Sequence, residues 1–519
     1  MKAGKHHLSK NQIRLQYSGF IIFTSQVIGI ITGLIYTLLL TRNMTTGQFG
    51  IWTNVFDYTG YFLLFSGLLP FWATRFVARG KAGTVKTATL AQLLIAVISV
   101  VIYLPAIVLI SRAIGTEVYL LIYLITGFYI LNTYMVTIFE SILTSVKPQA
   151  IGYGFLIEEI VKVTVAVVLI LGFRQLFLGA ILGLVISATV QISYYVHLLW
   201  DEFKQKTNWS YLKEWLKGST AIAYNAVGGQ LVAFVFILLF IYGGATPRAD
   251  YQAALSFTTV VGYSSSLAFA MYPKLLAKCC PEDQVRTSLR TVLMLAIPLS
   301  TITMVMSTSF LSVLNISYSG AWPVLIALTI NTLAGVITSF YSSLVMGREG
   351  FDAEGKISLR KLFGSKIFTV FSLGYIQAAI ALPLTYYVLT QLHVAGTPTA
   401  AVDVIAILTG VQLATYTGLY WLWRRSVSLP VAWKSIVKFV LASILMGIIL
   451  FLLPTTTTLL STIGKAIVGF AIYAGLLLSI DQQARELVKL IWKEITVTIR
   501  QLTHRGNNSG QDSGQNGLQ

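Results

Sequence analysis

The chain has 519 residues, of which 55% are hydrophobic and only 11% are charged, and its mean hydropathy is +0.75. A soluble core cannot use so much apolar surface, so this composition excludes a soluble globular protein and predicts an all-α polytopic membrane protein. The formal net charge of +18 favours nucleic-acid binding only if the basic residues do not collect in cytoplasmic loops.

Fourteen segments are long and apolar enough to cross a bilayer as helices, for which about 17 to 25 residues are needed. The first begins near Tyr17, is too long for the core of a signal peptide, and is therefore expected to be retained. The predicted spans cover residues 17–40, 49–76, 88–111, 117–144, 151–172, 176–199, 219–241, 251–278, 290–312, 320–346, 366–390, 401–423, 435–454 and 461–480.

The basic residues predict the orientation of these spans. Of the 37 Lys and Arg residues, 31 lie on one side if the N-terminus is cytoplasmic, and Lys162 lies deep within a span. Because positive charge collects on the cytoplasmic side, both termini are predicted to be cytoplasmic and the protein to lie in the cell membrane. The same distribution accounts for the net charge without nucleic acid. The five basic residues on the outer side are Arg42, Arg112, Arg174, Arg248 and Lys465.

A polar segment, residues 201–218, separates six spans from eight and is predicted to form an amphipathic helix on the cytoplasmic membrane surface, with Trp209, Leu212, Trp215 and Leu216 on one side. It divides an N-lobe, residues 1–200, from a C-lobe, residues 219–424. Spans 13 and 14, in residues 425–480, follow the lobes, and residues 481–519 are expected to form a basic amphipathic helix and a disordered tail.

Weak self-similarity supports the two lobes. Gln26 and Gln48 recur as Gln230 and Gln252 at an offset of 204, and Pro70 with Arg75 recurs as Pro273 with Lys278 at an offset of 203. Because each lobe has an even number of spans, both lobes begin on the same side of the membrane. The repeat is therefore parallel, with a pseudo-two-fold axis along the membrane normal, and a site between the lobes is expected.

Ionisable residues inside the membrane are candidate coupling or cavity groups, because a charge at the bilayer centre costs ~2.5 to 3.5 kcal/mol and needs a partner or water. In span 5, Lys162 lies about 40° around the helix from Glu158 and about 60° from Glu159, so it can neutralise one glutamate. The second can couple transport to a proton or sodium ion, contact sugar hydroxyls, or form an interhelical ion pair. The full set is Asp57, Glu140, Glu158, Glu159 and Lys162.

Three segments carry a family resemblance: LLLTRNMTTGQFGIW at residues 38–52, SILTSVKPQAIGYGFLIEEIVKV at 141–163 and VMGREGFDAEGKISLRKLFGSKIF at 345–368. The first two resemble helix junctions of the O-antigen-flippase-like members of the multidrug, oligosaccharidyl-lipid and polysaccharide (MOP) exporter superfamily. The third is similar to a loop in archaeal members. The resemblance implies a monomer that moves a polyprenyl-(di)phosphate-linked oligosaccharide from the cytoplasmic to the outer leaflet by alternating access, alongside glycosyltransferases of a surface polysaccharide or glycoprotein pathway.

A lipid-linked sugar carries a phosphate or diphosphate, which arginine binds with paired donors. Arg42 and Arg248 are predicted beside the outer mouths of the two lobes, and Arg75 and Lys278 beside the inner mouths. These four residues are candidate substrate contacts. Snorkelling to the membrane interface is the alternative explanation of their positions.

Motifs for other functions are weak. GFDAEGKI, at residues 350–357, lacks the Ser or Thr of a phosphate-binding loop and follows a membrane helix, so no nucleotide cofactor is expected. The five histidines are scattered without the spacing of metal ligands, so no metal cofactor is expected either. No catalytic constellation stands out, and the chain is not expected to be an enzyme. Two alternatives to a flippase stay open: a cation-coupled small-molecule exporter of the same superfamily, which needs a compact acidic pocket in one lobe, and a membrane glycosyltransferase, which needs an acidic outer domain.

Overall fold

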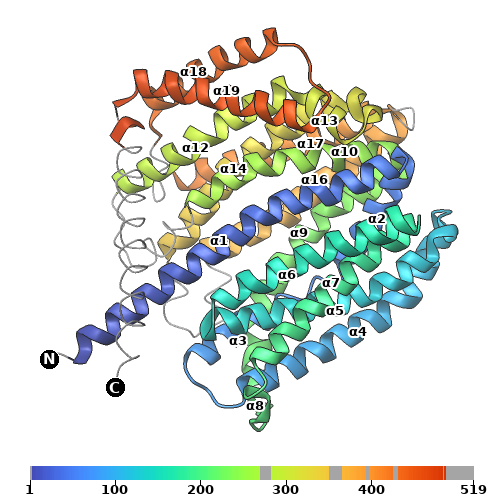
Figure 1. Ribbon diagram of the computed structural model, residues 1–519, viewed down its shortest axis with the longest axis vertical. Helices are drawn as coiled ribbons and strands as arrows, with labels where there is room; N and C mark the ends of the chain where they lie inside the picture. The colour runs from blue at the N-terminus through green and yellow to red at the C-terminus, as the bar shows by residue number, and fades with distance from the viewer. Residues whose placement is uncertain are drawn as a thin grey trace, which may run out of the picture.

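The computed structural model describes residues 3–268, 282–349, 365–392, 397–424, 431–482 and 484–486. Each regular element in these ranges is a helix (Figure 1). Eleven helices in this part of the chain are long and apolar enough to cross a membrane. The prediction of an all-α polytopic membrane protein is confirmed.

The first half of the chain forms a bundle in which α1 packs on α6, α6 on α7, α5 on α7, and α2 on α5. Short 3₁₀ or π segments lead into α5 and end α6. The elements are α1 (Ala3–Asn43), α2 (Thr46–Phe62), α3 (Pro70–Ala78), α4 (Thr84–Ala113), η1 (Glu117–Tyr119), α5 (Leu120–Val146), α6 (Gln149–Val167), η2 (Val168–Gly172) and α7 (Leu176–Leu198).

The second half repeats this packing: α9 packs on α16, α16 on α17, α14 on α17, and α10 on α14. In chain order α9, α10, α14, α16 and α17 are spans 7, 8, 10, 11 and 12. They contact one another in the same order as α1, α2, α5, α6 and α7, which are spans 1, 2, 4, 5 and 6. The elements are α9 (Thr220–Leu238), η4 (Leu239–Gly243), α10 (Ala245–Gly262), η5 (Tyr263–Ala268), α12 (Glu282–Val305), α13 (Ser307–Leu314), η6 (Ile316–Ala321), α14 (Trp322–Glu349), α16 (Lys366–Gln391) and α17 (Pro398–Trp423).

The predicted continuous span 49–76 is wrong, because the chain breaks between α2 and α3. Pro70 begins α3, where its missing N–H costs no helical hydrogen bond. Three carbonyls at the break accept hydrogen bonds from side chains elsewhere in the chain: Tyr134 donates to Phe62 (2.8 Å), Gln92 to Ser66 (2.7 Å), and Ser219 to Leu68 (2.8 Å). The irregular backbone thus has partners within the protein, as an interruption of a membrane helix requires.

Two other predicted spans are absent from the eleven candidates for different reasons. Span 151–172 is helical throughout, as α6 and η2, but its three charged residues exclude it on composition. Span 251–278 corresponds to α10 and η5, which begin six residues earlier than predicted, and its last ten residues lie outside the described ranges.

The polar segment between the halves contains η3 (Glu202–Lys204) and α8 (Ser210–Gly218). Trp209 and Leu216 are about half exposed (49% and 47%), but Trp215 is fully buried and packs edge-on against Phe76 of α3 at 5.5 Å. The backbone N–H of Asn208 also donates to Thr87 of α4 (2.9 Å). The expectation that Trp209 and Trp215 share a membrane-facing side is therefore wrong, because Trp215 anchors α8 to the protein.

The two helices that follow the repeat, α18 (Trp433–Leu452) and α19 (Leu459–Ile480), pack on each other and on α12 at one edge of the bundle (Figure 1). Asp481, just after α19, holds Arg290 of α12 at 2.7 Å and Lys438 of α18 at 3.6 Å. This buried carboxylate joins the final helices to the C-lobe. The predicted amphipathic helix and tail after residue 486 lie outside the described ranges.

Candidate functional site between and within the lobes

A buried ion pair joins the two lobes. Arg248 of α10 donates from Nε and Nη2 to the two carboxylate oxygens of Asp57 of α2, at 2.7 and 2.8 Å. The side chains are 5% and 9% exposed. The guanidinium also lies 5.4 Å from the ring centre of Phe236 and 5.5 Å from that of Tyr251. This two-pronged geometry is the strongest form of an Arg–carboxylate contact.

Further contacts between the lobes cluster where α1 ends and α2 begins, which we call the outer end because the charge distribution predicts it to face outward. Arg42 donates to the carbonyl of Val313 (2.9 Å), and Asn315 donates to the carbonyl of Thr41 (3.1 Å). A Cβ on Gly50 of α2 would overlap the carbonyl oxygen of Ala245 of α10, so only glycine permits this approach. The lobes are therefore closed against each other at the outer end.

A cavity of about 360 Å³ lies at the outer end. Its lining is rich in hydroxyl and amide groups and contains one charged side chain, that of Arg42. These groups suit a phosphate and sugar hydroxyls, both of which accept hydrogen bonds. The lining residues are Arg42, Asn43, Met44, Thr45, Thr46, Asn315, Ser317 and Tyr318.

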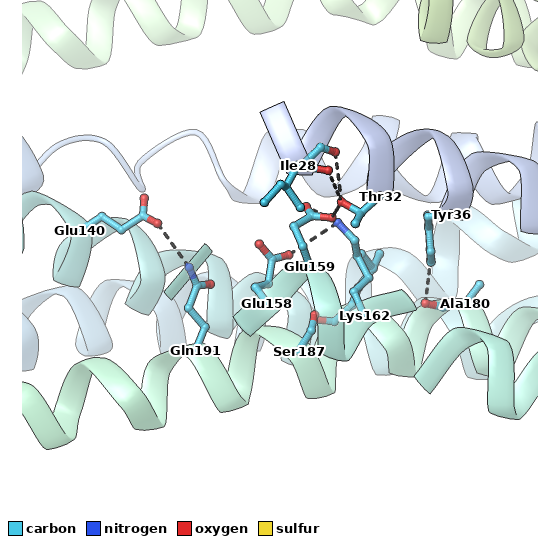
Figure 2. A network of polar contacts seen from close by, with 12 residues as sticks. Ile28, Thr32, Tyr36, Glu140, Glu158, Glu159, Lys162, Ala180, Ser187 and Gln191 are labelled. Atoms are coloured by element: carbon cyan, nitrogen blue, oxygen red, sulfur yellow. Dashed lines mark hydrogen bonds and ion pairs between the residues drawn. The ribbon is translucent and has the colours of Figure 1, made fainter. Parts of the chain in front are cut away.

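A second charged cluster lies within the N-lobe, between α1 and α6 (Figure 2). Lys162 donates to Glu159 at 2.6 Å and lies 3.9 Å from Glu158. Thr32 of α1 donates to the other carboxylate oxygen of Glu159 (2.5 Å), and the Tyr36 ring lies 5.8 Å from the Lys162 ammonium. The pairing predicted from helical spacing is present, and it identifies Glu158 as the carboxylate left with the weaker contact.

Glu140 of α5 lies beyond this cluster and faces α7 (Figure 2). Tyr195 and Gln191 of α7 donate to one of its carboxylate oxygens at 3.3 and 3.4 Å. Both bonds are long, and neither partner is charged. Glu140 is therefore held by polar groups but not by a cation in the contacts that the structure records for it.

The other predicted substrate contacts are placed differently from one another. Arg75 lies over the ring of Phe71 in its own helix, 4.0 Å from the ring centre, and Lys278 lies outside the described residues. Arg42 lines the outer cavity. Arg248, predicted to receive a diphosphate, is paired with Asp57 in this conformation, so the structure joins two residues for which separate roles were predicted.

The sequence prediction missed Asp250. This residue lies in the second turn of α10 and is 3% exposed, but the predicted eighth span begins at residue 251 and so left Asp250 among the loop residues. Within the segment GGATPRADYQAALSF, at residues 243–257, the helix already begins at Ala245. An earlier start would have placed Asp250 and Arg248 in the membrane-spanning bundle.

No family model matches this chain, and no curated protein sequence matches it. Among solved structures, it resembles the lipid II flippase MurJ in an inward closed conformation, with a TM-score of 0.66, 15% identity, and 90% of this chain and 100% of that chain covered. The chain has the fold of the MOP superfamily.

Two further structures with the MOP fold are also similar. An inward-facing multidrug resistance MATE family transporter of the MOP superfamily matches with a TM-score of 0.59 and 13% identity over 76% of this chain and 93% of that chain. A MOP superfamily transporter from Pyrococcus furiosus matches with a TM-score of 0.51 and 12% identity over 80% of this chain and 95% of that chain. At these identities the likeness establishes the fold, and the archaeal subtype stays a prediction.

Proposed function

We propose that this protein is a flippase for a polyprenyl-(di)phosphate-linked oligosaccharide. The observation that carries the proposal is the extent of the structural likeness. The match with the lipid II flippase extends over 90% of this chain, whereas the MATE transporter and the Pyrococcus transporter match 76% and 80% of it. A larger share of this chain is therefore covered by the match with a lipid II flippase than by either of the other two matches.

The contacts at the outer end support transport by alternating access. The Arg248–Asp57 pair, the Arg42–Val313 bond and the Asn315–Thr41 bond all join one lobe to the other, so they form and break as a set when the lobes move. Release of a substrate to the outer leaflet requires that this set opens. Pairs within a lobe, such as Lys162–Glu159, can persist through the same movement.

Arg42 is the residue best placed to meet the phosphate of such a substrate on the way out. It lines the outer cavity among hydroxyl and amide side chains, and it makes only one hydrogen bond among the described residues, to a carbonyl of the opposite lobe. When the lobes part, that bond is lost and the guanidinium becomes available. Transport toward the outer leaflet, glycosyltransferase partners and cytoplasmic termini remain part of the proposal.

One observation favours a second function, a cation-coupled small-molecule exporter with the same fold. Such an exporter needs a compact acidic pocket in one lobe, and Glu158 and Glu159, with Glu140 near them, are carboxylates gathered in one lobe (Figure 2). An exporter of this kind would use a proton or sodium gradient to drive the export of a small molecule and would not need a lipid-linked substrate.

The two functions are separated by reconstituting the full chain in vesicles with a fluorescent polyprenyl-diphosphate sugar. We expect transbilayer movement of the probe that depends on the protein and falls at least severalfold in Arg42→Gln, which removes the charge beside the cavity. Lys204→Gln, on the exposed segment between the lobes, is the matched control and should move the probe at the wild-type rate. Equal movement in empty vesicles would rule out the flippase.

A further inference from the structure

One face of α8 is fixed to the N-lobe. The ring of Trp215 lies 5.5 Å from that of Phe76 on α3, and the ring of Tyr211 lies 5.2 Å from it. The Tyr211 hydroxyl also donates to the carbonyl of Ala82, in the loop before α4 (3.4 Å). These contacts hold α8 at the edge of the bundle beside α3 (Figure 1), and they fix which side of the helix is turned away from the protein.

The depth of α8 is also fixed. Asn208, just before α8, donates its backbone N–H to Thr87 (2.9 Å), in the first turn of α4. Because α4 has 30 residues, it is ~45 Å long, about the thickness of a bilayer with its headgroups. The first turn of α4 therefore lies at headgroup level, at the inner end of the bundle opposite the outer end, and α8 lies beside it.

The uncovered side of α8 combines two apolar side chains with two lysines. Trp209 directly precedes the helix with helical backbone angles (φ −66°, ψ −13°), and both it and Leu216 are about half exposed. Lys213 and Lys217 are exposed. Since each residue advances about 100° around a helix, these four side chains fall within an arc of about 100°, which we call the exposed face of α8. Glu214 lies about 60° beyond Lys217 and outside this arc.

The lysines of this face are available to an external anion. Among the described residues, neither Lys213 nor Lys217 forms an ion pair. Lys204, earlier in the same segment, is held by Asp201 at 2.7 Å. The exposed face therefore presents two positive charges beside a tryptophan and a leucine.

This composition suits a membrane surface with negative charge. Tryptophan rings sit at the headgroup level of a bilayer, and lysine lays its apolar stem along the interface while its ammonium group meets phosphate. Trp200, two residues after α7 and 61% exposed, adds a second indole at the inner end of a candidate membrane span. A soluble partner would not require the face to lie at headgroup depth, so the position favours lipid.

We propose that the exposed face of α8 binds anionic phospholipid headgroups in the leaflet at the inner end. The helix is then held between the N-lobe on one side and lipid on the other. Ser219, which joins α8 to α9, donates to the carbonyl of Leu68 (2.8 Å) and accepts from the indole of Trp72 (3.1 Å), so the joint between the lobes belongs to this anchored unit. Anionic lipid therefore stabilises the N-lobe at the joint, whatever substrate the protein carries.

The first test measures which side of α8 meets lipid, without any transport substrate. The full chain with Cys279→Ser and Cys280→Ser carries one spin label, at Leu216→Cys or at Glu214→Cys, and is reconstituted in phosphatidylcholine vesicles that contain phosphatidylglycerol. Dissolved oxygen reaches a label in lipid, and a water-soluble nickel complex reaches a label in water. We expect the ratio of oxygen to nickel accessibility to be severalfold higher at 216 than at 214, about 160° away around the helix. Equal ratios would overturn the proposal and assign the face to a soluble acidic partner.

The second test measures the role of the lysines. Phosphatidylglycerol added to the full chain in detergent should raise its melting temperature, and phosphatidylcholine should raise it much less. The shift should fall by at least half in Lys213→Gln with Lys217→Gln. The matched control is Lys204→Gln with Lys206→Gln, which removes the same charge from the same segment outside the exposed face and should keep the wild-type shift. Equal shifts with the two lipids, or equal losses in the two double variants, would overturn the proposal.

Discussion

Two of the buried clusters that contain Arg or Lys, one around Lys162 and one around Arg248, differ in what they join. Lys162 and Glu159 are three residues apart in one helix, whereas Arg248 and Asp57 are 191 residues apart and belong to different lobes. A pair within a helix can keep its geometry while the lobes move, so it stabilises one lobe. A pair between the lobes exists only while the lobes touch, so it stabilises one conformation. The Lys162–Glu159 pair therefore stabilises the fold of one lobe, whereas the Arg248–Asp57 pair stabilises the closed conformation.

The strongest test of this difference is Asp57→Ala, which leaves Arg248 buried and unpaired in the closed state. Removing one partner of a buried pair costs about 3 to 5 kcal/mol, a shift of about a hundredfold or more in an equilibrium. Because Arg248 can reach water when the lobes part, we expect the lost stability of the closed state to appear as separation of the lobes at the outer end. The measurement is the distance between spin labels at Asn43 and Ser317, in a chain with Cys279→Ser and Cys280→Ser. The double variant Asp57→Asn with Arg248→Gln should close again, and an unchanged distance in Asp57→Ala would contradict the assignment.

Lys162→Met should act on unfolding instead. It leaves Glu159 and Glu158 without their cation, and no movement of the lobes relieves this, because all three residues lie in α6. The carboxylates can take up protons, so we expect a loss of about 2 to 3 kcal/mol in the free energy of unfolding. Thermal melting in detergent checks this. Unlike Asp57→Ala, Lys162→Met should leave the distance between the labels at Asn43 and Ser317 unchanged.

A finer comparison separates the two glutamates of α6. Glu159→Gln weakens the 2.6 Å bond from Lys162, and should cost about 1.5 kcal/mol, since hydrogen bonds to charged groups lie in this range. Glu158→Gln removes a carboxylate 3.9 Å from Lys162 and should cost below about 1 kcal/mol. Equal losses of melting temperature in the two variants would show that Lys162 serves both carboxylates alike.

The smallest effect is expected at Asp201, whose exposed pair with Lys204 is also local. The hydrogen bond and the charge of Lys204 hold the pKa of the Asp201 carboxyl below its usual range. A lowered pKa means that any stabilisation is present above the ordinary carboxyl pKa and is lost as the pH falls through the folded value. Because the pair is in water, Asp201→Asn should leave the melting temperature unchanged at neutral pH, and a drop comparable to that of Glu159→Gln would refute this.

Features that depend on residues near in the sequence were predicted correctly, and features that depend on residues distant in the sequence were not. Fourteen apolar stretches predict fourteen helical segments, and a helix repeat of 3.6 residues predicts that Lys162 reaches a glutamate three or four residues away. Those features depend on residues that are near in the chain. The break at residues 63–69 was not predicted, because it is stabilised by Gln92, Tyr134 and Ser219, which are distant from it in the sequence.

The amino-acid sequence by itself determined that this is a multi-span helical membrane protein with buried charges, since hydrophobic length and helical spacing are local properties. Only the tertiary structure decided the partners of charges that are far apart in the chain. It paired Arg248 with Asp57 across the lobes, placed Trp215 in the protein interior, and buried Asp250 in α10. The physical reason is that a charge within the membrane must find its partner wherever helix packing brings one, and packing joins residues that no sequence spacing relates.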